Sequence, residues 1–257
     1  MKTVIFNKYE IIDEIGKGSF GYTFLAANIR TNERVAVKIE PTTMPVSLLK
    51  NEARMYSELK SISGIPNMRW YGSCNNFYYI VIDLLGPDLH TYINSNPLTT
   101  SRANSIMRQL ISLLRSIHAN EIIHRDIKPA NILLDLHEGV ERLYLIDFGF
   151  ATKHCSENKD IKNNSLIGSL NYASVNVHLR HWISYRDDLE SLGYVYYFLQ
   201  SNGTLPWNDE HDEKQIINIK THFNWTSTQL KKFMDYIHTL EFDDIPTYTH
   251  LINLFCV

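Results

Sequence analysis

The sequence has few of the features that mark secreted, zinc-binding or membrane-spanning chains. Its three cysteines, Cys74, Cys155 and Cys256, lie far apart and form no CxxC pair or zinc-ligand spacing, so we expect reduced thiols. No apolar run approaches the roughly 20 residues that a membrane helix needs, and the N-terminus lacks the apolar core of a signal peptide. We therefore expect an intracellular protein, cytoplasmic or nuclear, that makes no membrane contact.

An excess of charge of one sign is also absent. Lysine and arginine together number 25 against 28 acidic residues, which gives a formal net charge of -3. Proteins that coat nucleic acid are usually strongly basic, so we expect no direct nucleic-acid binding. The 257 residues, 44% of them hydrophobic, are enough for one large domain or two lobes, without room for a further independent module.

Strand-type patterns dominate the first 85 residues. Runs rich in β-branched and aromatic residues, separated by Gly and Asn turns, predict strands over 9–15, 23–28, 34–40 and 77–85. Between the last two strands, residues 46–61 have the spacing of a helix. Its predicted inward stripe comprises Leu48, Leu49, Glu52, Met55, Tyr56 and Leu59. A carboxylate on such a stripe needs a partner if it is buried.

Helical patterns dominate the rest of the chain. Residues 100–119 carry apolar side chains on one face, and 187–199 are apolar nearly all round. A further helix is predicted to start at Thr226, with Gln229 completing a capping box. We expect an N-terminal lobe over 1–85 and a C-terminal lobe over 86–257, with the ligand site in the cleft between them.

A glycine-rich run, GKGSFG over residues 16–21, lies between two of the predicted strands. Taken alone, a GxGxxG run also fits a tight turn or a dinucleotide-binding fold. A dinucleotide fingerprint is followed by a helix, whereas this run is followed by a strand and then by the sequence VAVK over 35–38. That order is typical of protein kinases, in which glycines let backbone amides approach phosphates closely.

Lys38 lies on a predicted strand among apolar neighbours, so it too needs a partner. Glu52 on the following helix is the natural one. The pair has two interpretations: a purely structural ion pair, or a lysine that also holds the α- and β-phosphates of a nucleotide while the glutamate orients it. The neighbouring glycine run favours the second.

The segment HRDIKPANILL, 124–134, places an acid, a cation and an amide at offsets of two and five residues. We expect Asp126 to accept or orient the proton of an attacking hydroxyl and Lys128 to stabilise the transferring phosphoryl group. Asn131, together with Asp147 of the LIDFG run, is predicted to hold Mg²⁺, which prefers few, hard oxygen ligands from protein. The alternative is a polar loop that only caps a helix.

A lysine two residues after the aspartate favours serine and threonine over tyrosine as acceptors. Ser169 is in a position to bridge Asp126 and Lys128 through its hydroxyl. The competing interpretation is an ordinary loop serine.

With these motifs in order, the chain resembles a eukaryotic protein kinase, and more closely the casein kinase 1 group. The resemblance covers residues 9–255. Segments that carry it beyond the motifs above are 64–66, 69–70, 84–89, 172–176, 178–179, 186–194, 203–207 and 242–251. It implies an α+β, bilobal kinase fold, with a small, mainly β N-terminal lobe containing one helix and a larger, mainly α C-terminal lobe.

The resemblance also implies ATP and Mg²⁺ in the cleft, protein substrates and a monomeric enzyme. Ile82 would be the gatekeeper, the 83–85 backbone would bind adenine, and Asp188 would fix the catalytic loop. The expected nucleotide-binding residues are Ile15, Gly16, Lys17, Gly18, Ser19, Phe20, Gly21, Thr23, Ala36, Lys38, Ile82, Asp83, Leu85 and Leu133.

The chain departs from the group at a basic pocket that reads phosphate already present on the substrate. Asn171 stands where an arginine is usual, and Lys214 and Lys220 are doubtful matches to a second cation of that pocket. Asparagine lacks the charged fork that grips phosphate. We therefore expect less dependence on phosphate-primed substrates. Two other functions remain open: a pseudokinase scaffold on the same fold, which the full set of chemical residues disfavours, and a small-molecule kinase.

Overall fold

The structure is a computed structural model that describes residues 3–18, 21–137, 140–154 and 166–256. Ser19 and Phe20 of the glycine run lie outside the described residues, as does Cys155. The other two cysteines, Cys74 and Cys256, are exposed free thiols.

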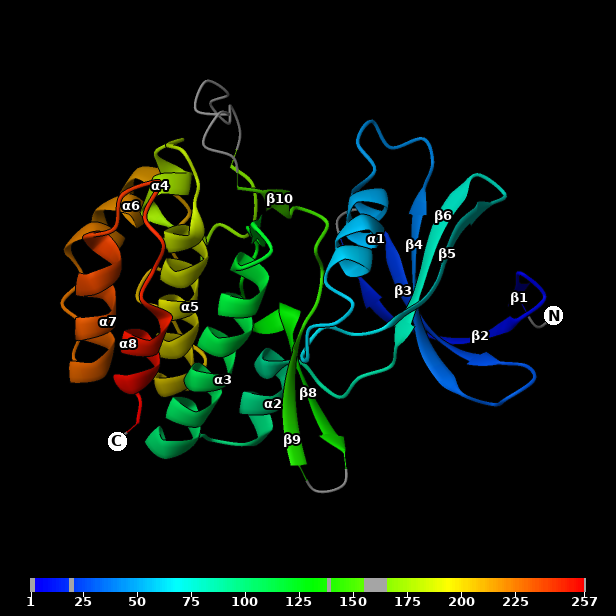
Figure 1. Cartoon of the computed structure of the whole chain (residues 1–257), viewed down its shortest axis with the longest axis horizontal. Coiled ribbons are helices and arrows are strands. Elements are labelled where there is room, and N and C mark those ends of the chain that lie inside the picture. The colour runs from blue at the N-terminus through cyan, green and yellow to red at the C-terminus, as the bar shows by residue number, and fades with distance from the viewer. Residues whose placement is uncertain (1–2, 19–20, 138–139, 155–165, 257) are drawn as a thin grey trace.

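One antiparallel sheet forms the N-terminal part of the molecule (Figure 1). Its strands run in the order β1-β2-β3-β4-β6-β5. They are β1 (Val4–Ile5), β2 (Tyr9–Lys17), β3 (Tyr22–Asn28), β4 (Arg34–Pro41), β5 (Met68–Cys74) and β6 (Phe77–Asp83). The four strand runs predicted from the sequence are confirmed, although the last ends at Asp83 rather than at residue 85.

Helix α1 (Leu48–Glu58) packs against β4, β5 and β6. Ser47 caps it by accepting a hydrogen bond from the amide of Lys50, which satisfies one of the amides that have no partner within the helix. The predicted inward stripe is buried except at Leu48, which is partly exposed. Glu52 lies within that stripe and is only 2% exposed.

Helices make up most of the C-terminal part (Figure 1). They are α2 (Leu89–Ser95), α3 (Thr100–His118), α4 (Val175–His178), α5 (Tyr185–Gln200), α6 (Glu213–His222), α7 (Thr228–His238) and α8 (Tyr248–Asn253). The buried helix α5 packs against both α3 and α7. Among the described residues, no helix is both long enough and apolar enough to cross a bilayer.

The predicted start of α7 was wrong by one residue. Ser227 is the N-cap, and its hydroxyl accepts a hydrogen bond from the amide of Leu230, whereas the expected capping box began at Thr226. Adjacent hydroxyl residues offer two cap registers one residue apart, and serine is the slightly better cap.

Short elements lie between the sheet and the helices (Figure 1). Strand β8 (Ile132–His137) pairs with β9 (Val140–Leu145), and β7 (Ile122–Ile123) pairs with β10 (Thr152–Lys153). The 3-10 turn η1 (Pro129–Asn131) precedes β8. One cluster of buried side chains runs from β4 and α1 through these elements to α3, α5 and α7, so the two parts of the chain pack as one body. The loops that carry Asp126 and Asp147 connect these elements.

Candidate active site

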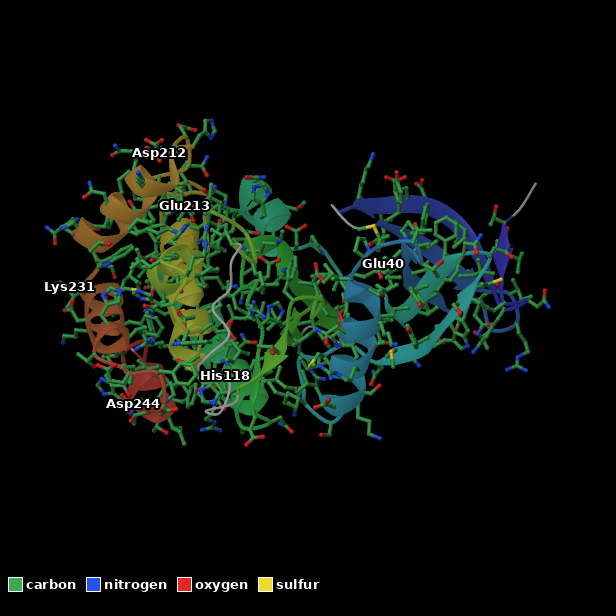
Figure 2. All side chains as sticks on the ribbon, turned by 90° about the horizontal axis from the view of Figure 1, so that it is seen from above. Glu40, His118, Asp212, Glu213, Lys231 and Asp244 are labelled. Carbon is green, nitrogen blue, oxygen red and sulfur yellow. The ribbon has the colours of Figure 1, made fainter. Side chains whose placement is uncertain are left out.

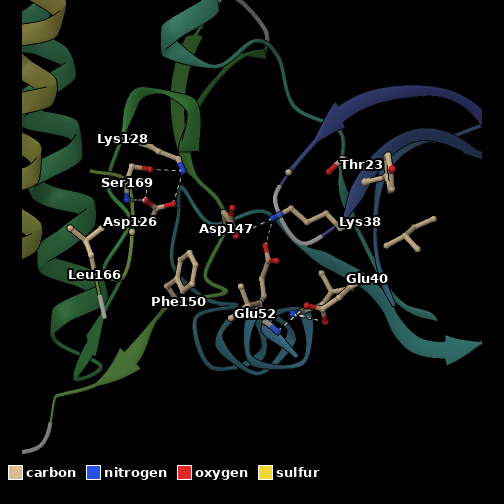
Figure 3. A pocket seen from close by; sticks show the side chains of 17 residues that line it. Thr23, Lys38, Glu40, Glu52, Asp126, Lys128, Asp147, Phe150, Leu166 and Ser169 are labelled. Atoms are coloured by element: carbon tan, nitrogen blue, oxygen red, sulfur yellow. Dashed lines mark hydrogen bonds and ion pairs between the residues drawn. The ribbon is translucent and has the colours of Figure 1, made fainter. Parts of the chain in front are cut away.

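A cavity of about 450 Å³ lies where the sheet, α1 and the loops around β8 and β10 meet (Figure 3). It collects side chains that are far apart in sequence. Its lining is Gly18, Gly21, Tyr22, Thr23, Lys38, Ile39, Glu40, Leu48, Leu49, Glu52, Asp126, Lys128, Asp147, Phe150, Leu166, Gly168 and Ser169. Residues from the glycine run, the 124–134 segment and the LIDFG run therefore face one space.

The glycine run forms the sheet side of this cavity. The amide of Gly18 donates to the carbonyl of Gly21 at 2.9 Å. A Cβ on Gly21 would lie 2.0 Å from the carbonyl oxygen of Ile39 on β4, so any other residue would displace the backbone. Glycine is needed here because two strands approach closely.

Lys38 lies between two carboxylates in the cavity (Figure 3). Its Nζ is 2.7 Å from Glu52 Oε1 and 3.5 Å from Asp147 Oδ1. The predicted pairing of Lys38 with Glu52 is confirmed. Burial alone would lower the pKa of Lys38, but the charges of Asp147 and Glu52 raise it. Lys38 is therefore a fixed cation.

The two carboxylates respond to Lys38 differently. Burial dominates at Glu52 and raises its pKa despite the nearby ammonium. At Asp147, burial would also raise the pKa, but Lys38 outweighs it and the pKa is lowered. The lowered pKa keeps Asp147 ionised, as a metal ligand must be.

Glu40, labelled in Figure 2 and in Figure 3, fixes the N-terminus of α1 to the strand that also carries Lys38. Its carboxylate accepts hydrogen bonds from the Ser47 hydroxyl at 2.6 Å and from the amides of Leu48 and Leu49 at 3.0 and 3.2 Å. A carboxylate at a helix N-terminus satisfies free amides and complements the helix dipole. Strand β4 therefore holds α1 at two points.

Asp126 is only 5% exposed and accepts four hydrogen bonds. Its Oδ1 accepts from the amide and hydroxyl of Ser169 at 3.0 and 2.9 Å. Its Oδ2 accepts from Lys128 Nζ at 2.7 Å and Asn131 Nδ2 at 3.0 Å. Lys128 also donates to the Ser169 hydroxyl at 2.9 Å, so the predicted serine bridge is present. These donors fix the plane of the carboxylate.

Asn131 is oriented with its amide oxygen free. Its Nδ2 donates to both the carbonyl and the carboxylate of Asp126, and no hydrogen bond from a described residue reaches its Oδ1. One amide oxygen and the ionised Asp147 match the donor set that Mg²⁺ takes when phosphate and water complete its shell. The residues therefore fit the ion.

The loop that carries Asp126 is braced from α5. Asp188 accepts hydrogen bonds from the amides of His124 and Arg125 at 2.7 and 2.9 Å, as the family resemblance implied. Gly168 has a φ of +94°, and a Cβ there would lie 2.5 Å from the carbonyl of Arg125. The segment with Ser169 can therefore reach Asp126 only through glycine.

The protein kinase domain family model matches residues 9–253. This chain belongs to the protein kinase domain family. Membership supports a phosphotransferase that acts on proteins, and the sheet-and-helix architecture is consistent with the two-lobed kinase fold.

Of the residues expected around adenine in this kinase domain, Thr23 lines the cavity, whereas Ile15, Ala36, Ile82, Asp83, Leu85 and Leu133 are not part of its lining. Ala36 and Ile82 are opposite one another on β4 and β6, and both are buried. Leu133 is half-buried on β8, whereas Ile15 is 49% exposed on β2. The Asp83 carboxylate accepts hydrogen bonds from Asn67 Nδ2 and from Arg69 Nε, the latter at 2.6 Å.

Several residues that line the cavity of the kinase domain were not predicted from the sequence. Leu48, Phe150 and Leu166 line it but have no motif that distinguishes them from ordinary apolar side chains. Tyr56 was assigned to the core, yet its hydroxyl also accepts a hydrogen bond from the Asp147 amide at 3.3 Å. A buried tyrosine usually finds a partner for its hydroxyl, and that rule was the available signal.

Proposed function

We propose that this kinase domain transfers the γ-phosphate of ATP to serine and threonine hydroxyls of proteins and resembles the casein kinase 1 group in doing so. One observation carries the proposal. The Asp126–Lys128–Ser169 cluster and the Lys38–Glu52–Asp147 cluster line one cavity, as in-line transfer requires. The N-terminal lobe would be 1–85 and the C-terminal lobe 86–257.

The Lys38 cluster is proposed to hold the phosphate chain. Lys38 would contact the α- and β-phosphates, and Glu52 would keep its ammonium pointed into the cavity. Asn131 and Asp147 would hold Mg²⁺, which when bound neutralises charge on the phosphates. Gly18 and Gly21 line the cavity, and glycines let backbone amides approach a phosphate closely.

The Asp126 cluster is proposed to handle the acceptor. Asp126 would orient the substrate hydroxyl and take its proton, while Lys128 would stabilise negative charge on the transferring phosphoryl group. Lys128 already bonds both Asp126 and Ser169. A substrate hydroxyl therefore meets a carboxylate whose orientation is fixed before binding.

The base is proposed to bind beside segment 83–85, which links β6 to the C-terminal part of the chain. Because the Asp83 side chain is engaged by Asn67 and Arg69, this segment would offer adenine its backbone at Asp83 and Leu85. The apolar contacts would be Ile15, Thr23, Ala36, Leu133 and the gatekeeper Ile82, and the phosphate-side backbone would be residues 16–21.

Monomeric state, absence of nucleic-acid binding and an intracellular location remain predictions.

A phosphorylation screen tests this function against the pseudokinase alternative. Purified protein is mixed with radiolabelled ATP, Mg²⁺ and peptide sets that differ only in a central Ser, Thr or Tyr. We expect labelling of the Ser and Thr sets, at least about 10-fold above the Tyr set. Absence of labelling despite Mg-ATP binding would favour a scaffold, and labelling of Tyr would overturn the acceptor assignment.

Reduced dependence on primed substrates is also proposed, and the burial of Lys220 beneath the segment around Asn171 supports it. Lys220 is 1% exposed, and its ammonium donates to the carbonyls of Leu170 and Ala173 at 3.2 and 2.7 Å. Burial lowers its pKa to about 7. Lys220 therefore braces the Asn171 segment from inside, and Lys214 is exposed at the start of α6.

Replacing Asn171 by arginine is expected to create a preference for primed peptides. A charge-assisted guanidinium–phosphate contact contributes about 1.5–3 kcal/mol, so kcat/KM on a phosphorylated peptide should rise about 10-fold relative to its unphosphorylated twin. Steady-state kinetics on both peptides measures the ratio for parent and N171R. A strong primed preference already present in the parent would rule the idea out.

A further inference from the structure

Asn51, on the face of α1 beside Glu52, reaches a turn almost a hundred residues away in the sequence. Its Nδ2 lies 3.4 Å from the carbonyl oxygen of Phe148, 3.0 Å from that of Gly149 and 2.8 Å from that of Ala151. An amide NH₂ has two hydrogens, so the two shorter contacts are the strong ones and the third is shared. This side chain therefore serves three backbone acceptors at once.

The orientation of the Asn51 amide is fixed from its other side. Arg54 Nη2 donates to Asn51 Oδ1 at 3.0 Å, one turn further along α1. Guanidinium groups only donate, so this contact assigns the oxygen to the Arg54 side and the NH₂ to the carbonyls. Arg54 itself is exposed and Asn51 is partly buried.

The turn that Asn51 contacts starts immediately after the proposed metal ligand. Asp147 has a φ of +68°, a conformation that is uncommon for a residue with a side chain and that persists only when its surroundings enforce it. The turn closes through a hydrogen bond from the Ala151 amide to the Phe148 carbonyl at 3.0 Å. Phe148, Gly149 and Ala151 are buried, so their carbonyls need partners inside the protein.

We propose that Asn51 is a positioning residue that joins α1 to the 148–151 turn and thereby sets where Asp147 stands relative to Lys38. Glu52, the next residue of the same helix, accepts a hydrogen bond from Lys38. The two neighbouring side chains thus tie one helix both to the phosphate-side lysine and to the segment that follows the metal ligand. The effect of Asn51 on phosphoryl transfer rests on the proposed function. Its hydrogen bonds to the 148–151 turn are present without any ligand.

The variant Asn51→Leu removes the donors while keeping a good helix former at the position. Hydrogen exchange of the ligand-free protein is the first measurement. We expect the Ala151 amide to exchange at least about fivefold faster, because the turn opens more often, with amides of α5 unchanged. The second measurement is ADP binding. The Kd with Mg²⁺ should rise about 10-fold, the equivalent of one lost hydrogen bond, while the Kd without metal stays within twofold.

Two further variants make the comparison specific. Asn51→Asp keeps the shape but turns oxygens toward three carbonyls, and it should show the same changes or larger ones. Lys50→Ala, an exposed neighbour on the same helix, should match the parent in both measurements. If Asn51→Asp alone had an effect, charge repulsion rather than lost donation would explain it and the proposal would fail.

Unchanged exchange and unchanged Mg²⁺-dependent ADP binding in Asn51→Leu would also overturn it, as would equal losses with and without metal. The outcome is separable from that of the proposed function. A parent that binds Mg-ADP but transfers no phosphate would remove the transfer function alone, because exchange and binding still decide the role of Asn51.

Discussion

Replacing Asp126 by asparagine is expected to lower the rate of phosphoryl transfer by about 10³-fold, within the 10²–10⁴ range of general acid–base catalysis. Asparagine cannot take the proton of the substrate hydroxyl. In the parent protein both carboxylate oxygens of Asp126 accept hydrogen bonds, from Ser169, Lys128 and Asn131. The NH₂ group of asparagine would therefore face donors in place of one of these oxygens. The measurement is single-turnover transfer to a Ser peptide at saturating Mg-ATP.

Binding and folding controls separate chemistry from damage to the fold in D126N. The unsatisfied donors should cost about 1–3 kcal/mol of unfolding free energy, so the variant should remain folded. Its Kd for Mg-ADP should stay within a few-fold of the parent value. Asp209→Asn, the same exchange at an exposed site, should behave as the parent does. A D126N protein that keeps more than about a tenth of parental activity would exclude the assigned role.

Site residues were predictable from the sequence where they need a charged partner or belong to a recognisable motif. Glu52 was recognisable because a carboxylate on an apolar stripe must have a partner, and the Lys38 contact at 2.7 Å confirms it. Ser169 was expected to bridge Asp126 and Lys128 through its hydroxyl, and both its hydroxyl and its amide donate to the Asp126 carboxylate. Strand periods and the glycine run also predicted the sheet and the edge of the cavity.

Side chains that serve the backbone were not predictable in this way. Glu40 caps α1 and Asn51 holds the 148–151 turn, yet each looks like an ordinary surface residue in the sequence. Their partners are amides and carbonyls, which every residue has, so no residue type marks the contact. Such contacts depend on tertiary packing that brings distant backbone close, and only coordinates show them.

Replacing Lys38 by methionine is expected to reduce kcat/KM for ATP by about 10²–10³-fold, as loss of a preorganised electrostatic contact does. It should also destabilise the fold. Glu52 would remain buried beside Asp147 without its cation, and breaking a buried pair costs about 3–5 kcal/mol. Steady-state kinetics and urea unfolding measure the two effects separately.

The double variant K38M with Glu52→Gln decides between the two interpretations of this ion pair. Glutamine carries no charge, so most of the lost unfolding free energy should return, because replacing both partners of a buried pair is close to neutral. Activity should not return, since no cation remains for the phosphates. If activity recovered together with stability, Lys38 would be a structural residue only, and the phosphate-binding role assigned to it would be wrong.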